Sequence, residues 1–219
     1  MALSLRNAAA KIGLSGNFSV VHDFFGCLTE PSGLSVMAQT DRVTSFRRVD
    51  MNMIRVGAEQ FTFADFQEID AAVQNTRNMY AQVSLAVGRI LHWQISNAEA
   101  NGYDDIGSDD EASDLTDDWT VPNDALDIFL VLTYSGSTIG LSAVDGSCNK
   151  DAKGMDGSVV AIEGSANTTG FVLAHEAGHY LGLSHVNDST NLMNPTVPNG
   201  GSLTSSQGSN MRDHCFVKA

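Results

Sequence analysis

The spacing of hydrophobic and polar residues divides most of this chain into strand-like and helix-like segments. Residues 48–56 and 87–95 alternate as strands do, and 127–134 is a continuous apolar run typical of a central parallel strand. Between the first two, apolar residues over 66–83 recur at three- and four-residue steps, which predicts an amphipathic helix of about five turns. Thr62, with an aspartate three residues later, forms a capping pattern at its start.

The second half of the chain continues this alternation. Two shorter strands are predicted over 137–144 and 157–163, followed by a helix that Thr168 or Thr169 caps. A last helix begins at 203–207 and ends near Phe216. The order of strand, helix, four strands and helix predicts an α/β fold with a mainly parallel sheet.

Residues 1–45 show neither the helix nor the strand periodicity, and glycine and proline interrupt them. We therefore predict an N-terminal extension over 1–45 and one folded domain over 46–219. The 219 residues, 42% of them hydrophobic, suffice for such a domain with its own core. No apolar run approaches a membrane span, which predicts no membrane insertion, and no secretory signal peptide is visible.

Charge narrows the classes of partner. Aspartate and glutamate number 26 against 12 lysines and arginines, giving a net charge of −14, which argues against nucleic acid as a partner. The acidic residues concentrate in 103–118. This segment has two interpretations, a solvated loop with a short helix or a group of carboxylates that binds Ca²⁺. Its spacing does not match an EF-hand loop, so calcium stays an open alternative.

The clearest candidate chemistry lies in residues 175–185, which read H-E-x-x-H-x-x-G-x-x-H. On a helix, His175 and His179 lie about 40° apart around the axis, so both rings can face one metal ion. On a continued helix, His185 would lie about 9 Å beyond His179. Gly182 ends the helix before that, because glycine adopts the left-handed conformation without a Cβ penalty.

Three neutral imidazoles leave a fourth position on zinc open for water. Glu176 is then free to act as the general base that activates this water. The alternatives are a buried helix that happens to carry histidines, or a non-catalytic binding module stabilised by zinc. The other histidines, His22, His92 and His214, stand outside ligand spacing and are predicted to be surface or hydrogen-bonded core residues.

The stretch 191–195 places Met193 in a turn-rich setting after the histidines. The zinc motif and this turn together resemble the metzincin family of zinc endopeptidases, in which such a Met-turn forms a hydrophobic floor beneath the metal. The resemblance implies a twisted, mainly parallel five-stranded sheet with an antiparallel edge strand, long helices and the zinc helix at the cleft. It divides the domain into an upper subdomain, 46–185, and a small lower one, 186–219. The pattern is closest to the reprolysin and matrixin branches, and it leaves the choice between them open.

The resemblance also implies a protein or peptide substrate, bound in extended form along the edge strand. An unpaired strand edge is a template for an added strand, although the alternative is that this strand pairs internally as plain sheet. The implied substrate-binding residues are Gly140, Leu141, Ser142 and Ala143 on the edge strand and Pro195, Thr196 and Val197 at the pocket after the scissile bond.

Three cysteines complete the set of candidate residues. The resemblance implies a disulfide between Cys148 and Cys215, which together with the family favours a secreted or extracellular location. Cys27 has two interpretations. Its thiolate could occupy the open zinc position, making 1–45 prosegment-like and the protein latent, or it is a buried free cysteine or an alternative disulfide partner. The predicted function is that of a zinc-dependent endopeptidase. The sequence does not indicate its oligomeric state.

Overall fold

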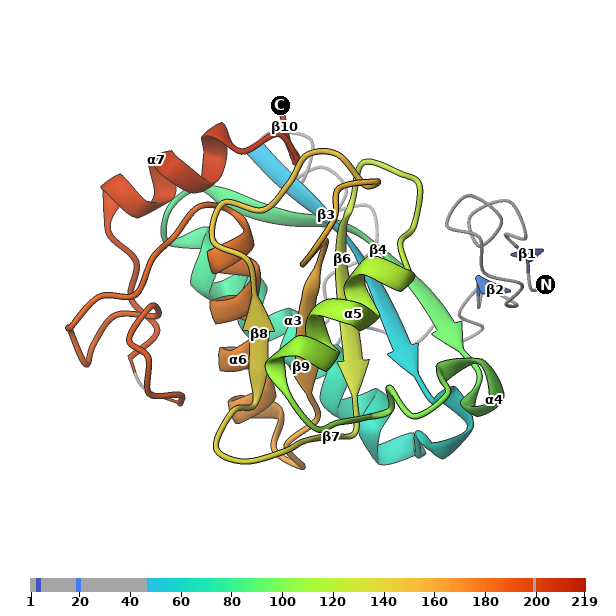
Figure 1. Cartoon of the computed structure of the whole chain (residues 1–219). Helices are drawn as coiled ribbons and strands as arrows, with labels where there is room; N and C mark the ends of the chain where they lie inside the picture. Colours follow the sequence, from blue (N-terminus) through green and yellow to red (C-terminus); the bar gives the residue numbers. More distant parts are fainter. Residues whose placement is uncertain (1–2, 5–18, 21–46, 199) are drawn as a thin grey trace.

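The computed structural model describes residues 3–4, 19–20, 47–198 and 200–219. A twisted sheet forms its middle layer, with helices α3 and α6 behind the sheet and α5 in front of it (Figure 1). The strands of this sheet are β1 (Leu3–Ser4), β2 (Ser19–Val20), β3 (Arg47–Val56), β4 (Leu85–Ile95), β6 (Leu126–Val131), β8 (Gly140–Ser142), β9 (Ser158–Ala161) and β10 (Val217–Lys218). The helices are η1 (Ala58–Gln60), α3 (Phe63–Ala81), α4 (Asn97–Ala100), α5 (Asp109–Asp118), α6 (Ala166–Tyr180) and α7 (Ser205–Asp213).

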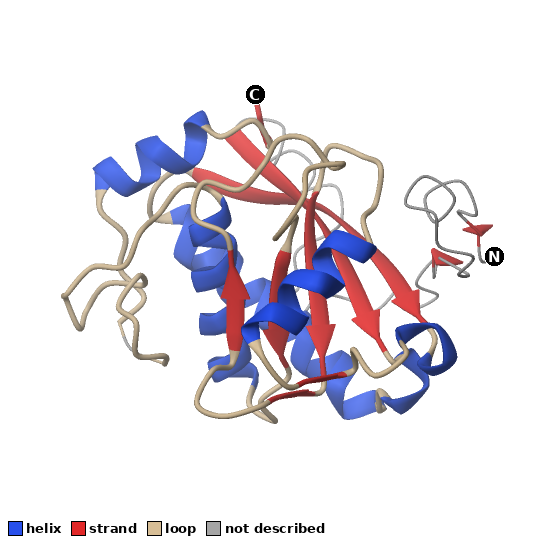
Figure 2. Ribbon diagram, in the orientation of Figure 1, coloured by secondary structure: helices blue, strands red, loops and turns tan. Residues whose placement is uncertain are grey.

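The sheet has the predicted topology. Its strand order is β1-β2-β4-β3-β6-β9-β8, with β10 paired to β3. Strands β4, β3, β6 and β9 are parallel to one another, and β8 lies antiparallel to β9 at the end of the row (Figure 2). The mainly parallel sheet with an antiparallel edge strand is therefore confirmed. The described sheet has eight strands and not five, because β1, β2 and β10 add two residues each, too few to leave a period in the sequence.

Strand β3 is buried on both faces, as a central strand of a three-layer fold must be. Met51 and Met53 pack into the core shared with α3 and α6, whereas Ile54 and Val56 pack into the core beneath α5. The sheet thus separates two hydrophobic cores. The larger one supports the helix that carries the histidines.

Helix α3 begins as its capping pattern predicts. The Thr62 side chain accepts a hydrogen bond from the Asp65 backbone N–H, and the Asp65 carboxylate accepts one from the Thr62 backbone N–H. The helix ends at Ala81, two residues before the predicted limit at Val83, and Ser84 then adopts a φ of 56°. This left-handed residue turns the chain into β4.

Close contact with α3 fixes the position of α6. A Cβ on Gly170 would lie 2.7 Å from the Asn75 Cβ of α3, so only glycine allows this approach. The Tyr80 hydroxyl of α3 donates to the Ala174 carbonyl of α6 at 2.8 Å. Since Ala174 directly precedes His175, this bond lies one residue from the histidine pair.

The predicted cap of α6 is wrong. Ser165 is the N-cap, and its side chain accepts a hydrogen bond from the Thr168 backbone N–H at 3.4 Å. Thr169 is unavailable as a cap because its hydroxyl is buried and donates to Glu68 Oε1 at 2.6 Å. A tertiary contact therefore decides which of several hydroxyl residues begins the helix.

Three predicted boundaries also differ from the structure. The apolar run 127–134 breaks at Leu132, after which β7 (Thr133–Tyr134) pairs with β5 (Asp105–Ile106) in a separate small sheet. The strand predicted over 137–144 is shorter, since only β8 pairs with β9. Helix α7 ends at Asp213, and the chain beyond it pairs with β3. No helix in the described ranges is both long enough and apolar enough to cross a bilayer.

Candidate functional site

The end of α6 brings the third histidine back toward the first two. Gly182 has a φ of 94°, its N–H donates to the His179 carbonyl at 2.9 Å, and the Leu183 N–H donates to the Gly178 carbonyl at 3.0 Å. These two bonds form a Schellman motif, which stops the helix and reverses the chain. The predicted helix end at Gly182 is confirmed.

The structure brings His175, His179 and His185 together. Their Nε2 atoms lie 3.0 to 3.1 Å from one another, with the first two rings buried and the third exposed. The three rings point at a common centre. In the described part of the chain, only one other group of three metal-ligating residues converges in this way.

Backbone carbonyls set the protonation of the two buried rings. His175 Nδ1 lies 2.8 Å from the Leu192 carbonyl oxygen, and His179 Nδ1 lies 2.6 Å from the Leu183 carbonyl oxygen. Because a carbonyl only accepts, Nδ1 carries the proton in both rings and their Nε2 lone pairs face the centre. Burial lowers the pKa of His175, and it lowers the pKa of His179 to about 4, so both rings stay neutral.

Lone pairs that converge at this distance repel one another unless a cation lies between them. The donor set, neutral imidazoles with their outer nitrogens held by carbonyls, is the one that zinc takes in proteins. The residues present therefore fit a zinc ion, and His175, His179 and His185 are the residues that would hold it. No fourth protein donor is part of this cluster of described residues.

Glu176 is a residue of α6, and its side chain lies against the edge strand. Its side chain is 7% exposed, and a Cβ on Gly140 of β8 would lie 2.7 Å from Glu176 Cγ. Burial raises the pKa of the Glu176 carboxyl to about 8. A divalent cation at the histidine cluster would oppose this shift by favouring the carboxylate.

The turn that follows the histidines packs under the zinc helix. Met193 is fully buried, and a Cβ on Gly178 would lie 3.0 Å from its sulfur. The Val186 N–H donates to the Met193 carbonyl at 2.9 Å, which joins this turn to the residue after His185. With the bond from His175 to Leu192, the turn contacts two of the three histidine segments.

The predicted substrate residues lie on two segments. Gly140, Leu141 and Ser142 form β8, and Ala143 follows directly after this strand. Among the described residues, β8 pairs with β9 on one side and ends the sheet on the other, so internal pairing accounts for one edge only. Beyond the Met193 turn, Pro195 and Thr196 are exposed, and the half-buried Val197 packs against the larger core.

The cysteines and remaining histidines lie as follows. Cys148 and Cys215 form a disulfide with a Cα–Cα distance of 6.0 Å. His214 is buried and its Nε2 lies 3.1 Å from the Gly146 carbonyl oxygen. His92 lies in β4. The predictions for Cys27 and His22 concern positions outside the described residues.

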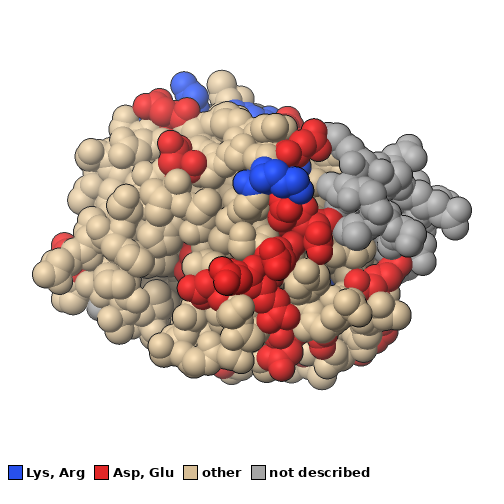
Figure 3. Space-filling view, viewed as in Figure 1, with Lys and Arg blue, Asp and Glu red and all other residues tan. Residues whose placement is uncertain are grey.

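The acidic segment is mostly helix. Acidic side chains gather in a band over α5 and its neighbouring loops (Figure 3). Protein donors engage several of them: the Tyr134 hydroxyl donates to Asp109 at 2.7 Å, and the Tyr103 hydroxyl to Asp118 at 3.0 Å. No three carboxylates converge on one point in the described part of the chain, so the structure gives no support to the calcium alternative.

Sequence reasoning missed the contacts of Tyr180, which fills an unspecified position of the zinc motif. Its hydroxyl lies 2.9 Å from both the Ser147 carbonyl and Asp156 Oδ1, and its ring stacks on Phe216 at 6.0 Å. The Gly146 N–H donates to the Tyr180 carbonyl at 2.9 Å. Tyr180 thus holds the loop after β8 against the zinc helix. No local pattern predicts such a contact, because its partners are distant in the sequence.

The fold and the site together define a class. An α/β sheet with an antiparallel edge strand, a helix bearing H-E-x-x-H and a third histidine returned by a glycine turn are the features of a metallopeptidase catalytic domain. Residues 66–186, more than half of the chain, match the reprolysin-like metallo-peptidases of family M12B, and the chain belongs to this family. Membership implies a zinc cofactor and a peptide substrate, and it resolves the open choice between branches in favour of the reprolysins.

Among curated proteins, the chain is similar to disintegrin and metalloproteinase domain-containing protein 33 of Homo sapiens, at 39% identity over 67 residues. The match spans 29% of this chain and 8% of the human protein. Among solved structures, metalloproteinase-II from Bacteroides fragilis aligns with a TM-score of 0.47 and 18% identity, over 78% of this chain and 54% of that one. A chaperone–substrate complex aligns with a TM-score of 0.45 and 16% identity, over 76% of this chain and 33% of the other.

Proposed function

We propose that this protein is a zinc-dependent endopeptidase whose catalytic domain spans 46–219, with the cleft between the parts before and after His185. The observation that carries the proposal is the convergence of three Nε2 atoms within 3.1 Å, beside the buried carboxyl of Glu176. A structural zinc site normally has four protein ligands. Three histidines with an adjacent acid favour catalysis over a binding module.

In the proposed reaction, His175, His179 and His185 would hold the metal and Glu176 would move the proton. Zinc in such a site lowers the pKa of a bound water to about 7 and polarises a carbonyl. The Glu176 carboxylate accepts the proton of the attacking water and then donates it to the amine of the leaving peptide. The Leu192 and Leu183 carbonyls hold the two buried rings in the tautomer that the site needs.

The proposed substrate is an extended peptide. It would add as a strand to the outer edge of β8, with Gly140, Leu141, Ser142 and Ala143 beside its backbone. Glu176 contacts this strand at Gly140, so a peptide on the edge of β8 would pass close to the proposed base. Pro195, Thr196 and Val197 would form the wall of the pocket for the residue after the scissile bond.

Two further proposals rest on the family and the disulfide. Met193, packed under Gly178, is proposed as the Met-turn residue that supports the metal site. The disulfide between Cys148 and Cys215 favours an oxidising compartment, and so a secreted or extracellular protein.

The test separates metal binding from proton transfer. Glu176→Ala should keep one equivalent of zinc and lose hydrolysis of a quenched peptide by several orders of magnitude, because it removes the base and no ligand. His185→Ala should lose zinc and activity together. The matched control is Glu163→Ala, which removes an exposed carboxylate and should retain both. Turnover by Glu176→Ala at the parent rate would contradict the proposed role.

A further inference from the structure

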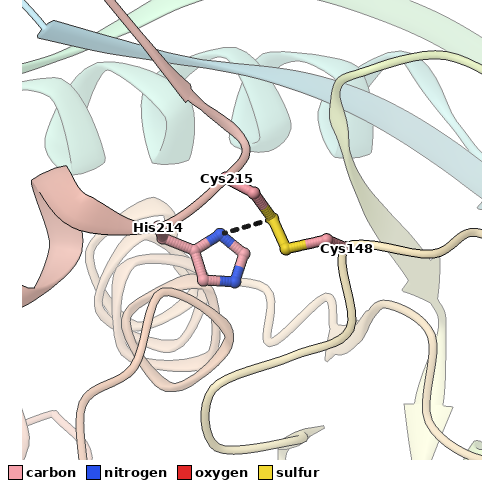
Figure 4. Close-up of side chains that lie close together, drawn as sticks. All are labelled: Cys148, His214 and Cys215. Atoms are coloured by element: carbon pink, nitrogen blue, oxygen red, sulfur yellow. Dashed lines mark hydrogen bonds between the residues drawn. A yellow bond between two sulfur atoms is a disulfide. The ribbon is translucent and has the colours of Figure 1, made fainter.

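A second cluster of metal-ligating side chains lies away from the histidine trio, where the loop after β8 meets the end of the chain. Cys148, His214 and Cys215 have ligand atoms within 4.8 Å of one another (Figure 4). His214 Nδ1 lies 3.7 Å from the Cys215 sulfur. As a disulfide, the two sulfurs are poor ligands, so the question is what the cluster becomes when that bond is reduced.

The tautomer of His214 suits metal binding. Its Nε2 lies 3.1 Å from the Gly146 carbonyl oxygen, which can only accept, so Nε2 carries the proton. The unprotonated Nδ1 is the nitrogen on the sulfur side, where it accepts one long hydrogen bond of 3.3 Å from the Phe216 N–H. As in His175 and His179, a carbonyl holds the protonated nitrogen, but the lone pair of the other nitrogen is engaged by the Phe216 N–H, a bond that a cation would replace.

The cluster is open to solvent. Both cysteines are exposed, and they line one side of a cavity of about 330 Å³. Lys150 also lines it, but its ammonium lies 2.8 Å from the buried Asp127 carboxylate, which offsets its charge. Asp124 lines the cavity with a carboxylate that is 70% exposed and paired with Lys218. A cation, a reductant and a fourth ligand such as water therefore have access.

We propose that reduction of the disulfide converts Cys148, Cys215 and His214 into a second metal site, for a thiolate-preferring divalent cation such as Zn²⁺. A dithiol supplies two electrons and two protons to the sulfur–sulfur bond and becomes a disulfide itself. Binding of the cation then releases the two thiol protons to solvent. Two thiolates and one imidazole select zinc over calcium or magnesium, which prefer oxygen ligands.

The site would keep the same two segments joined in both redox states. The loop of Cys148 is bound to the zinc helix through Gly146 and Tyr180, and the segment of Cys215 pairs with β3 through β10. In the oxidised protein the sulfur–sulfur bond links these segments. In the reduced protein the bridging cation would take its place.

Cobalt is a suitable probe because thiolate ligation gives Co²⁺ an intense near-ultraviolet charge-transfer band that a site of three histidines lacks. The experiment uses full-length protein carrying Cys27→Ser, so that any thiolate comes from the proposed pair. The oxidised protein should bind one Co²⁺ per chain without this band. After reduction by a phosphine in the presence of Co²⁺, it should bind two and show the band.

Variants assign the second ion to the cluster. In the reduced protein, Cys148→Ser or Cys215→Ser should abolish the tight second site. His214→Ala should weaken it by at least the 10–100-fold that loss of an outer-shell partner costs a metal site. His92→Ala, a histidine in β4, is the matched control and should titrate as the parent.

Three outcomes would overturn the proposal. They are an unchanged cobalt stoichiometry on reduction, a second ion without the thiolate band, and a His214→Ala titration equal to that of the parent. Unfolding on reduction with Co²⁺ present, seen as loss of the far-ultraviolet circular dichroism signal, also counts against it. The first Co²⁺ reports on the histidine trio separately, so failure here is distinct from failure of the proposed protease site.

Discussion

Gly140 is the position where the edge strand and the proposed general base touch. A methyl group there would lie 2.7 Å from both Glu176 Cγ and Val172 Cγ1, closer than carbon atoms can approach. Gly140→Ala must therefore displace Glu176 or β8. We expect peptidase activity to fall by about 100-fold or more, since moving a catalytic group by about 1 Å has that effect. Zinc should stay bound, because Gly140 is not a ligand.

The measurement for Gly140→Ala is kcat/KM on a quenched peptide together with zinc content. Gly107→Ala is the control, because its added methyl would meet only a carboxylate oxygen of Glu111, at 3.1 Å. Activity of Gly140→Ala within twofold of that control would show that the contact with Glu176 has no catalytic consequence.

Asp156 gives a prediction about pH. The Tyr180 hydroxyl has one proton for two acceptors, the Ser147 carbonyl and Asp156 Oδ1, and Asp156 Oδ2 has no hydrogen-bond partner among the described residues. Burial raises the pKa of Asp156 to about 6, against opposing effects of Tyr180 and Lys150. A protonated Asp156 can donate to Tyr180 and leave the phenol free to donate to Ser147.

Because the pKa of Asp156 is higher in the folded protein than its ordinary value of 3.8, its contribution to stability is fully present below pH 3.8. It is lost as pH rises through about 6. We expect Asp156→Asn to remove this loss, so that its stability relative to the parent rises by up to about 3 kcal/mol between pH 4 and 7. Urea unfolding across this range measures it, with the exposed Asp110→Asn as control. If the free energy of unfolding changed with pH in the same way in Asp156→Asn and in the parent, the raised pKa of Asp156 would be contradicted.

At the scale of the elements, the end of α6 determines where the third histidine lies. Gly182 and Gly154 share a φ of 94°, but only Gly182 terminates the helix that carries the histidines. Alanine at either position should cost about 1–2 kcal/mol of stability for the left-handed backbone. Only Gly182→Ala should also weaken zinc binding, because it alone changes where His185 lies.

Zinc titration and thermal unfolding of Gly182→Ala and Gly154→Ala test this distinction. Equal zinc affinities in the two variants would mean that His185 reaches the metal without the Schellman turn.

The strength of each element's sequence signal explains which elements were predictable. Helix α3 has a capping box and a long amphipathic period, both of which are local, and its start was predicted correctly. The cap of α6 was not, since Thr169 and Ser165 are both good capping residues and a contact with Glu68 decides between them. Strands of two residues, such as β10, carry no period at all.

At the scale of the whole molecule, a disulfide links the loop after β8 to the C-terminal segment. The disulfide joins residues 67 positions apart, which in the chain-entropy model contributes about 4 kcal/mol. The double variant Cys148→Ser, Cys215→Ser should therefore melt roughly 8–16 °C below the parent. Calorimetry of the oxidised proteins measures this, with Cys27→Ser as the matched control. A difference under about 2 °C would show that the link constrains the unfolded chain little.

Much of the site was predictable because its information is local. Four residues on a helix separate two ligands, and the next glycine stops that helix, so the spacing alone predicted that three rings would converge. The identity of the proposed base followed from its place beside the first ligand. The mainly parallel sheet followed from the order of periodic segments.

Other features are fixed by residues that are far apart in the chain. The carbonyls that set the histidine tautomers, the approach of Gly140 to Glu176, the hold of Tyr180 on the loop after β8 and the position of His214 beside the disulfide have no local sequence signal. Periodicity and capping report the conformation of neighbouring residues, so the sequence by itself determined the main helices and strands and the ligand spacing. Contacts between elements depend on how closely the layers pack, and that was decided by the tertiary structure alone.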